Sequence, residues 1–164
     1  MTQSSVFARR IGSVGFALAL AAGFALSAYA QTAPSPARQV VDARKAVFTL
    51  IGTNCRALGD VVKGTAPFDS ADVQKRVARI AFLSDLVGES FPDASNVGEP
   101  DTKAKPDIWT DKAAFAKKVA DLQEHAKALV PVSATEKGAT DTFKTAFAAL
   151  AQDCKGCHET YRVK

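Results

Sequence analysis

The chain has 164 residues, of which 23% are charged and 47% hydrophobic, and its formal net charge at neutral pH is +4. This length suits a single domain with one hydrophobic core. Residues 1–30 hold two of the 21 basic side chains and none of the 17 acidic ones, which leaves 19 against 17, or +2, for the remainder. So mild a balance does not indicate binding to nucleic acid or to a membrane surface.

Residues 1–30 have the pattern of a secretory signal peptide. The basic pair Arg9-Arg10 precedes a short apolar segment over residues 11–26, and Ala28-Tyr29-Ala30 fits the small-residue cleavage site. The apolar run is too short, and its flanks are wrong, for a membrane-spanning helix. We therefore expect cleavage after residue 30 and a mature domain of residues 31–164 outside the cytoplasm, with no membrane insertion and with the export route left open.

Apolar residues that step by three and four predict a first pair of helices. The first covers about residues 37–62, with Ser35-Pro36 as its start and Gly64 as its end. The second covers about residues 70–88 and has Asp69 as its N-cap. The core positions predicted for this pair are Val41, Arg44, Phe48, Ile51, Cys55, Leu58, Val62, Val73, Val77, Ile80, Ser84 and Val87.

Residues 92–107 separate the two halves of the chain. They are rich in Gly, Pro, Asn, Asp and Lys and show no periodicity, so they predict a long loop, and long ordered loops are often functional. The third helix is predicted over about residues 111–129, capped by Thr110 or Asp111 and ended by Pro131. Its core positions are Phe115, Val119, Leu122, Ala126 and Leu129.

The last helix is predicted from about residue 139. Ser133 and Glu136 have the spacing of a capping box, although Gly138 interrupts the first turn. The three-four spacing then continues through Phe143, Phe147, Leu150, Cys154, Cys157 and Tyr161. No strand-like alternation competes with these segments, so the sequence predicts an all-α fold, an antiparallel four-helix bundle.

The pentapeptide Cys154-Lys155-Gly156-Cys157-His158 is the most informative motif. C-x-x-C-H is the signature for covalent attachment of a c-type haem. Residues three and four apart share one face of a helix, so two thiols could form thioethers with the haem and the imidazole of His158 could be the axial iron ligand. Since Cys154 and Cys157 lie in the core stripe, we expect one haem c, partly buried against the C-terminal helix.

Three other interpretations of the motif stay open. A thioredoxin-like redox pair would open a helix after a strand. A structural zinc site would need Cys55 and a histidine, His125 or His158, in addition to Cys154 and Cys157. A structural disulfide is possible in an exported protein. If haem takes two of the three cysteines, Cys55 remains a free thiol, and a small buried residue is its expected role.

Four more residues carry a chemical expectation. Arg44 stands at a core position, where it needs a partner such as a haem propionate, unless it reaches solvent from the helix end. His125 lies beside its apolar stripe, which favours a solvated position. Lys103 and Lys105 could reach a propionate or an electron-transfer partner. We find no nucleophile with a base, no phosphate loop and no paired carboxylates, so we do not expect an enzyme.

The sequence resembles the class II cytochromes c, and more closely cytochrome c prime, over nearly the whole mature chain. The segments that carry the resemblance are Arg44-Lys45-Ala46, Ile51-Gly52, Asn54, Val62-Lys63-Gly64, Phe68-Asp69, Lys103-Ala104-Lys105-Pro106-Asp107-Ile108-Trp109, the C-x-x-C-H pentapeptide and Tyr161-Arg162. The resemblance implies a periplasmic four-helix bundle with one haem c, usually a homodimer packed through its first two helices. It also implies that Arg44 binds a haem propionate and that Arg162 lies in the proximal pocket.

The members of the family that the sequence resembles differ in the sixth ligand of the iron. Low-spin members use a methionine of the first helix, whereas cytochrome c prime leaves that side unligated; here the only methionine is Met1, and Phe48 occupies the position that looks like the distal residue. We therefore expect five-coordinate, high-spin iron. The implied functions are electron transfer with an unknown redox partner and binding of nitric oxide and carbon monoxide. The alternative is a low-spin, six-coordinate electron carrier, with His125 as the first suspect for the extra ligand and no gas-binding role.

Overall fold

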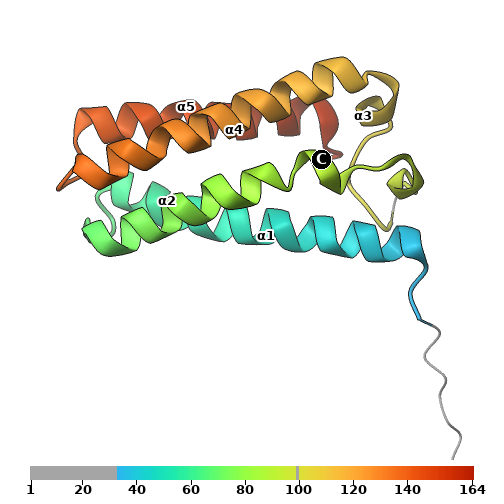
Figure 1. Ribbon diagram of the computed structural model, residues 1–164, viewed down its shortest axis with the longest axis horizontal. Coiled ribbons are helices and arrows are strands. Elements are labelled where there is room, and N and C mark those ends of the chain that lie inside the picture. The colour runs from blue at the N-terminus through green and yellow to red at the C-terminus, as the bar shows by residue number, and fades with distance from the viewer. Residues whose placement is uncertain (1–32, 99) are drawn as a thin grey trace, which may run out of the picture. The chain divides into compact units, whose positions relative to one another are not determined.

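A computed structural model describes residues 33–98 and 100–164, and the predicted signal peptide lies outside these residues. Its long helices are α1 (Pro36–Lys63), α2 (Ser70–Asp85), α4 (Lys112–Thr135) and α5 (Asp141–Tyr161) (Figure 1). The connection between α2 and α4 contains two 3-10 turns, η1 (Gly88–Ser90) and η2 (Asp93–Ser95), and the short helix α3 (Asp107–Thr110). The predicted all-α, four-helix architecture is confirmed.

The helix starts follow the sequence signals. The Ser35 hydroxyl accepts a hydrogen bond from the Arg38 amide at 3.2 Å, and Pro36 is the first helical residue of α1. Gly64 ends that helix with φ 74°, a left-handed conformation that favours glycine. The Asp69 carboxylate accepts from the Asp72 amide at 2.9 Å and caps α2 in the same way.

The predicted end of α4 is wrong. Pro131 lies inside the helix, which continues to Thr135. Proline removes one backbone hydrogen bond, but Leu129 and Ser133 on either side of it are buried, so packing keeps the helix intact. The predicted capping box is wrong for the same reason. The Ser133 hydroxyl donates to the Val130 carbonyl within α4, and Thr140 caps α5 by accepting from the Phe143 amide at 3.3 Å.

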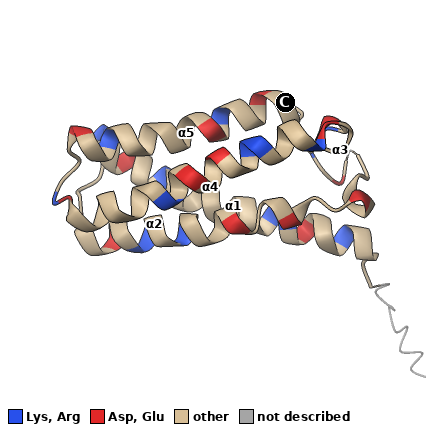
Figure 2. Ribbon diagram, turned by 45° about the horizontal axis from the view of Figure 1, so that its top comes forward, with Lys and Arg blue, Asp and Glu red and all other residues tan. Residues whose placement is uncertain are grey.

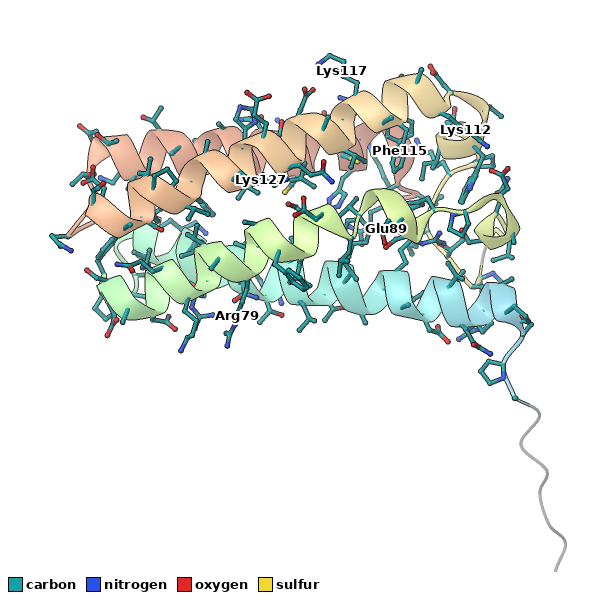
Figure 3. The ribbon with its side chains drawn as sticks, viewed as in Figure 1. Arg79, Glu89, Lys112, Phe115, Lys117 and Lys127 are labelled. Atoms are coloured by element: carbon teal, nitrogen blue, oxygen red, sulfur yellow. The ribbon has the colours of Figure 1, made fainter. Side chains whose placement is uncertain are left out.

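Two apolar clusters make up the core. The first lies toward the α4–α5 turn and contains Leu58, Val61, Val73, Val77, Ile80, Ala126, Leu129, Phe143, Phe147 and Leu150. The second lies toward the other end and contains Ile51, Leu83, Val87, Ile108, Phe115, Val119 and Tyr161, with Phe48, Phe91, Trp109 and Cys157 packed against it. Charged side chains such as Arg79 and Lys117 point away from the bundle (Figure 3).

The four long helices do not approach one another equally. The backbones of α1 and α2, of α2 and α4, and of α4 and α5 pack closely along their lengths. Among the described residues, the backbones of α1 and α5 come much less close, so these two helices meet mainly through their side chains. No described helix is both long and apolar enough to cross a membrane.

Candidate functional site

The C-x-x-C-H pentapeptide lies on the last two turns of α5. At 100° per residue, Cys154, Cys157 and His158 fall within an arc of about 100° on the helix surface. The cysteines are partly buried and His158 is exposed. The end of α5 is held in place, because the Lys105 amide donates to the Tyr161 carbonyl at 2.9 Å and the Val163 amide donates to the Lys103 carbonyl at 2.8 Å.

Cys154 faces α1, where it meets Cys55. The Cys55 thiol donates a hydrogen bond to the Cys154 sulfur, which raises the pKa of Cys55 and lowers the pKa of Cys154. Burial raises the pKa of Cys55 further. The same burial holds Cys55 in its protonated form and opposes reaction as a thiolate. The expectation that Cys55 is a small residue packed in the core agrees with its contacts to both clusters.

Cys157 points into the second core cluster, where burial raises the pKa of its thiol. His158 follows it but lies at the surface, beside Arg162. Partial burial, and then the charge of Arg162, lower the pKa of His158, so its imidazole is neutral at pH 7. A neutral imidazole keeps the nitrogen lone pair that an iron ligand requires.

Aromatic rings join α1 to α5 across the second cluster. Phe48, on α1, packs edge-on against Phe91 with ring centroids 6.1 Å apart. Phe91 packs against Phe115 at 4.9 Å, and Phe115 against Tyr161 at 5.2 Å. This places Phe48 in the same apolar environment as Cys157, with a ring that cannot ligate a metal.

Arg44 is only 3% exposed and links α1 to the long loop. Its guanidinium donates to the Ser95 hydroxyl at 2.9 Å, the Thr102 hydroxyl at 2.8 Å and the Ser90 carbonyl at 3.2 Å. It also lies over the Phe91 ring, 4.6 Å from the centroid. Burial lowers the pKa of Arg44, but arginine remains charged.

The partners of Arg44 are all neutral. Among the described residues no carboxylate pairs with it, and these bonds use three of its five N–H groups. A buried cation without a counter-ion is costly unless an anion completes the site. The cage around Arg44 therefore has the chemistry to receive one carboxylate.

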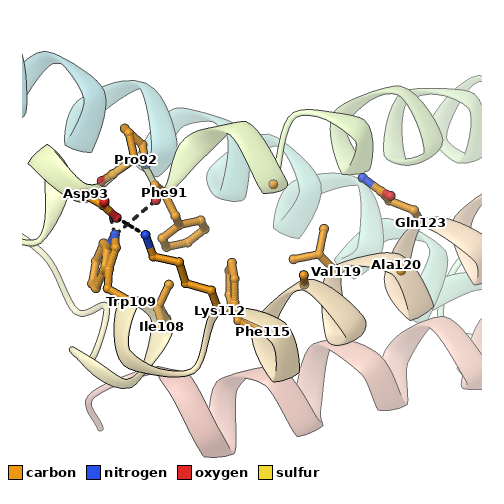
Figure 4. Close-up of a pocket in the computed structure, with 12 residues that line it drawn as sticks. Phe91, Pro92, Asp93, Ile108, Trp109, Lys112, Phe115, Val119, Ala120 and Gln123 are labelled. Carbon is orange, nitrogen blue, oxygen red and sulfur yellow. Dashed lines mark hydrogen bonds and ion pairs between the residues drawn. The ribbon is translucent and has the colours of Figure 1, made fainter.

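A groove of about 570 Å³ opens beside the second cluster, between η1 and α4 (Figure 4). Phe91, Ile108, Trp109, Phe115 and Val119 form most of its apolar wall. The Trp109 indole N–H is shared between the carbonyls of Phe91 at 3.1 Å and Pro92 at 3.2 Å. The ion pair of Lys112 with Asp93, at 2.7 Å, lies at the same end.

His125 is paired with Asp153 on α5. Its Nδ1 lies 2.7 Å from the Asp153 carboxylate, and its side chain is 41% exposed, in agreement with the solvated position that the sequence favoured.

The described residues do not support the other interpretations of the pentapeptide. The cysteines close a helix instead of opening one, and no three His, Cys, Asp or Glu side chains gather as a metal site. All three cysteines are free thiols.

The residues present fit a covalently bound haem. Two thiols and a neutral imidazole lie on one arc of α5, aromatic rings surround the inner thiol, and a buried arginine has N–H groups to spare. The wider separation of α1 from α5 coincides with the site. Sequence periodicity missed Phe91, which lies between η1 and η2, and Trp109, which lies on the four-residue helix α3; Trp109 entered the sequence analysis only through the family resemblance.

The sequence model of the cytochrome c prime family matches residues 39–162, nearly all of the described chain. The chain belongs to the cytochrome c prime family. One covalently bound haem c is the cofactor of this family. The family, the four-helix fold and the cofactor expected from the sequence are therefore confirmed.

Similar proteins cover the whole bundle. The cytochrome c prime of Rhodopseudomonas palustris is 35% identical over 155 residues, which is 94% of this chain and 97% of that protein. The structure of cytochrome c prime from Shewanella frigidimarina covers 80% of this chain and 100% of that chain with a TM-score of 0.73 and 33% identity.

A third relative, the cytochrome c prime of Alcaligenes xylosoxidans, has been solved with gases bound. One variant is a nitric oxide complex, which is 30% identical, covers 78% of this chain and 97% of that chain, and has a TM-score of 0.70. Another has carbon monoxide bound, is 29% identical, covers 79% of this chain and 98% of that chain, and has the same TM-score.

Proposed function

We propose that this cytochrome c prime is exported to the periplasm after cleavage of residues 1–30, binds nitric oxide and carbon monoxide at five-coordinate haem iron, and exchanges electrons with a redox partner. It acts as a binding and carrier protein and not as an enzyme. The observation that carries the proposal is the environment of Cys157, where Phe48 supplies an apolar ring from α1 and no ligating side chain. The gas complexes of the Alcaligenes xylosoxidans protein support the same conclusion.

The proposed ligands follow from the geometry of α5. Cys154 and Cys157 hold the haem through thioethers, and His158 is the axial ligand. When bound, the haem supplies one redox-active iron with a coordination site that a small gas can occupy. Arg44 binds a propionate with the N–H groups that its neutral partners leave over. Arg162 lies beside His158 in the proximal pocket, where both line one groove.

The side opposite His158 offers no sixth ligand in this proposal. The only methionine, Met1, belongs to the predicted signal peptide, and His125 is held by Asp153. A phenyl ring excludes water and offers no hydrogen bond to bound dioxygen. Nitric oxide and carbon monoxide need no such bond, so we expect the site to select them.

The deciding measurement is the absorption spectrum of the exported, purified protein, oxidised and reduced, before and after addition of nitric oxide. Broad high-spin bands that change with the gas are expected. Sharp low-spin bands that ignore the gas would instead identify a six-coordinate electron carrier, with His125 as the first ligand to replace. A protein without haem bands would refute the assignment of all three pentapeptide ligands.

Replacing Phe48 with alanine should speed carbon monoxide binding to the reduced protein by about tenfold. The substitution removes the ring that fills the approach to the sixth site, and each factor of ten corresponds to about 1.4 kcal/mol in the barrier. Flash photolysis of the carbon monoxide complex measures the rate. Val130→Ala, at an exposed apolar residue of α4, is the control and should leave the rate unchanged. Equal rates in wild type and Phe48→Ala would show that Phe48 is not the gate.

The first two helices also present an apolar outer surface. Phe82 on α2 is 67% exposed and Leu50 on α1 is 51% exposed. The resemblance to class II cytochromes c implies a homodimer packed through its first two helices, and exposed apolar side chains on those helices fit such a contact. We propose that this surface joins two copies of the chain as a homodimer.

Replacing Phe82 with aspartate should weaken that dimer by at least about tenfold in dissociation constant, because the substitution buries a carboxylate at an apolar contact. Analytical ultracentrifugation of the haem-loaded protein measures the constant. Val130→Asp, at another exposed apolar residue on α4, is the matched control and should not shift it. A monomeric wild type, or equal effects of both substitutions, would refute the assigned surface.

A further inference from the structure

We propose that the C-terminal basic surface, defined as Lys103, Lys155, Arg162 and Lys164 around His158, is the docking site for an acidic redox protein. The inference rests on the proposed function, because it places electron exchange at the end of α5 next to the proposed axial ligand. It adds the location of the contact and the charge of the partner.

The surface is a shallow depression of about 360 Å³. Its lining contains the four basic side chains, His158, Val163 and one acidic side chain, Glu159. All four basic residues are exposed. Lys155 and Glu159 are 4.0 Å apart and both more than 60% exposed, so this pair is screened by water and leaves the positive charge largely uncompensated.

Backbone hydrogen bonds hold the segment that carries Lys103 against the segment that carries Arg162. Ala104 and Arg162 form an antiparallel bridge, and the amide-to-carbonyl bonds between residues 103–105 and 161–163 flank it. The Lys105 ammonium donates to the Thr160 carbonyl at 3.1 Å and adds a side-chain tie. A preorganised surface loses less conformational entropy on binding than two free loops would.

The positive charge is concentrated here and not spread over the bundle. Counted over side chains alone, the surface carries +3, from four basic residues and Glu159, whereas residues 31–164 together carry only +2. Elsewhere on the described bundle, several basic side chains lie in ion pairs with carboxylates. These include Lys112 with Asp93, Lys117 with Asp121 and Lys127 with Asp85. Figure 2 shows the two signs interspersed along α1, α2 and α4.

A local excess of one sign attracts partners of the other sign and raises their association rate. Because His158 lies within this surface, a partner held there is adjacent to the residue proposed to ligate the iron. A purely structural role for these cations, as favourable charges near the C-terminus of α5, would stabilise the helix without steering any reactant. The property to measure is therefore the rate of reaction with charged oxidants and its dependence on salt.

The test compares two double variants of the haem-loaded protein. Lys103→Glu with Lys155→Glu reverses the proposed surface. Lys63→Glu with Lys137→Glu changes the net charge equally at the opposite end of the bundle, and Lys63 also lies in a last helical turn. Stopped-flow oxidation of the reduced protein uses ferricyanide as the anionic oxidant and tris(phenanthroline)cobalt(III) as the cationic one, over a series of salt concentrations.

At low salt, we expect the surface variant to react with ferricyanide about tenfold more slowly than the control variant and with the cobalt complex faster. The differences should vanish near 1 M salt, where the screening length is about 3 Å. Calorimetric titration with poly-L-glutamate, a carboxylate-rich probe, should show binding to wild type and to the control variant but not to the surface variant. Equal rates and equal binding in the two variants would overturn the proposal.

The readouts separate this inference from the proposed function. Haem content and the spectral response to nitric oxide report on the proposed function alone, since that proposal gives the propionate contact to Arg44 and assigns no haem contact to the four substituted lysines. Binding of poly-L-glutamate depends only on the surface. A spectrum indifferent to nitric oxide combined with salt-dependent steering would refute gas binding and support the docking site.

Discussion

Replacing both Cys154 and Cys157 with alanine should produce a protein that carries no covalently attached haem. A thioether forms only where a thiol meets a haem vinyl group, and Cys55, the one remaining cysteine, comes from α1 and lacks the spacing to the imidazole of His158. The covalent haem content, measured by haem staining after denaturing electrophoresis, should fall from one haem per chain to none. Mass spectrometry of the exported protein gives the same answer independently.

The matched control is Cys55→Ala, which should retain its haem. Thiol titration under denaturing conditions sharpens the comparison: the wild type should show one free thiol per chain and the Cys55→Ala protein none. Three reactive thiols in the wild type, or haem lost with Cys55 alone, would contradict the assignment of Cys154 and Cys157.

Replacing Arg44 with leucine should lower the free energy of unfolding by about 3 kcal/mol. Three hydrogen bonds to a charged group, each contributing about 1.5 kcal/mol or more, are lost, and removal of the cost of burying the guanidinium offsets part of that loss. Urea denaturation of the haem-loaded protein, followed by far-UV circular dichroism, measures the change.

Two further variants distinguish the contribution of the buried contacts of Arg44 to stability from the contribution of its charge. Arg79→Leu removes the same charge from the outside of α2 and should cost less than about 0.5 kcal/mol. Arg44→Lys keeps the charge but loses the planar fork that reaches Ser95 and Thr102 together, so its stability should fall between wild type and Arg44→Leu. Identical denaturation midpoints for the leucine variants at both positions would show that the buried contacts of Arg44 contribute nothing.

Most of the fold could be predicted because its determinants are local. The three-four spacing of apolar residues on α1, from Val41 to Leu58, identifies a buried face without any knowledge of what covers it. The end of α4 could not be predicted in this way. Proline is a helix breaker locally, and only the burial of Leu129 and Ser133 against other helices explains why the helix continues past Pro131.

The candidate site likewise has a part that local sequence predicts and a part that depends on how the helices pack. The spacing within Cys154-Lys155-Gly156-Cys157-His158 predicts the chemistry of the site, because all three side chains proposed to hold the haem belong to one helix. The contact of Cys55 with Cys154 depends on how far α1 is shifted along α5, and periodicity within each helix does not determine that register. The neutral cage of Arg44 is built from loop residues, Ser95 and Thr102, which have no repeating pattern.

The looser approach of α1 to α5 also bears on the order of assembly. These two helices come from opposite ends of the bundle sequence, so the residues on either side of the site are the first and last parts of the domain to be synthesised. Contacts between distant segments carry the largest loop-closure cost in folding. We therefore expect the region between Phe48 and the pentapeptide to close late, after the neighbouring helices have paired. Attachment of the cofactor before that last closure needs no reopening of a finished core.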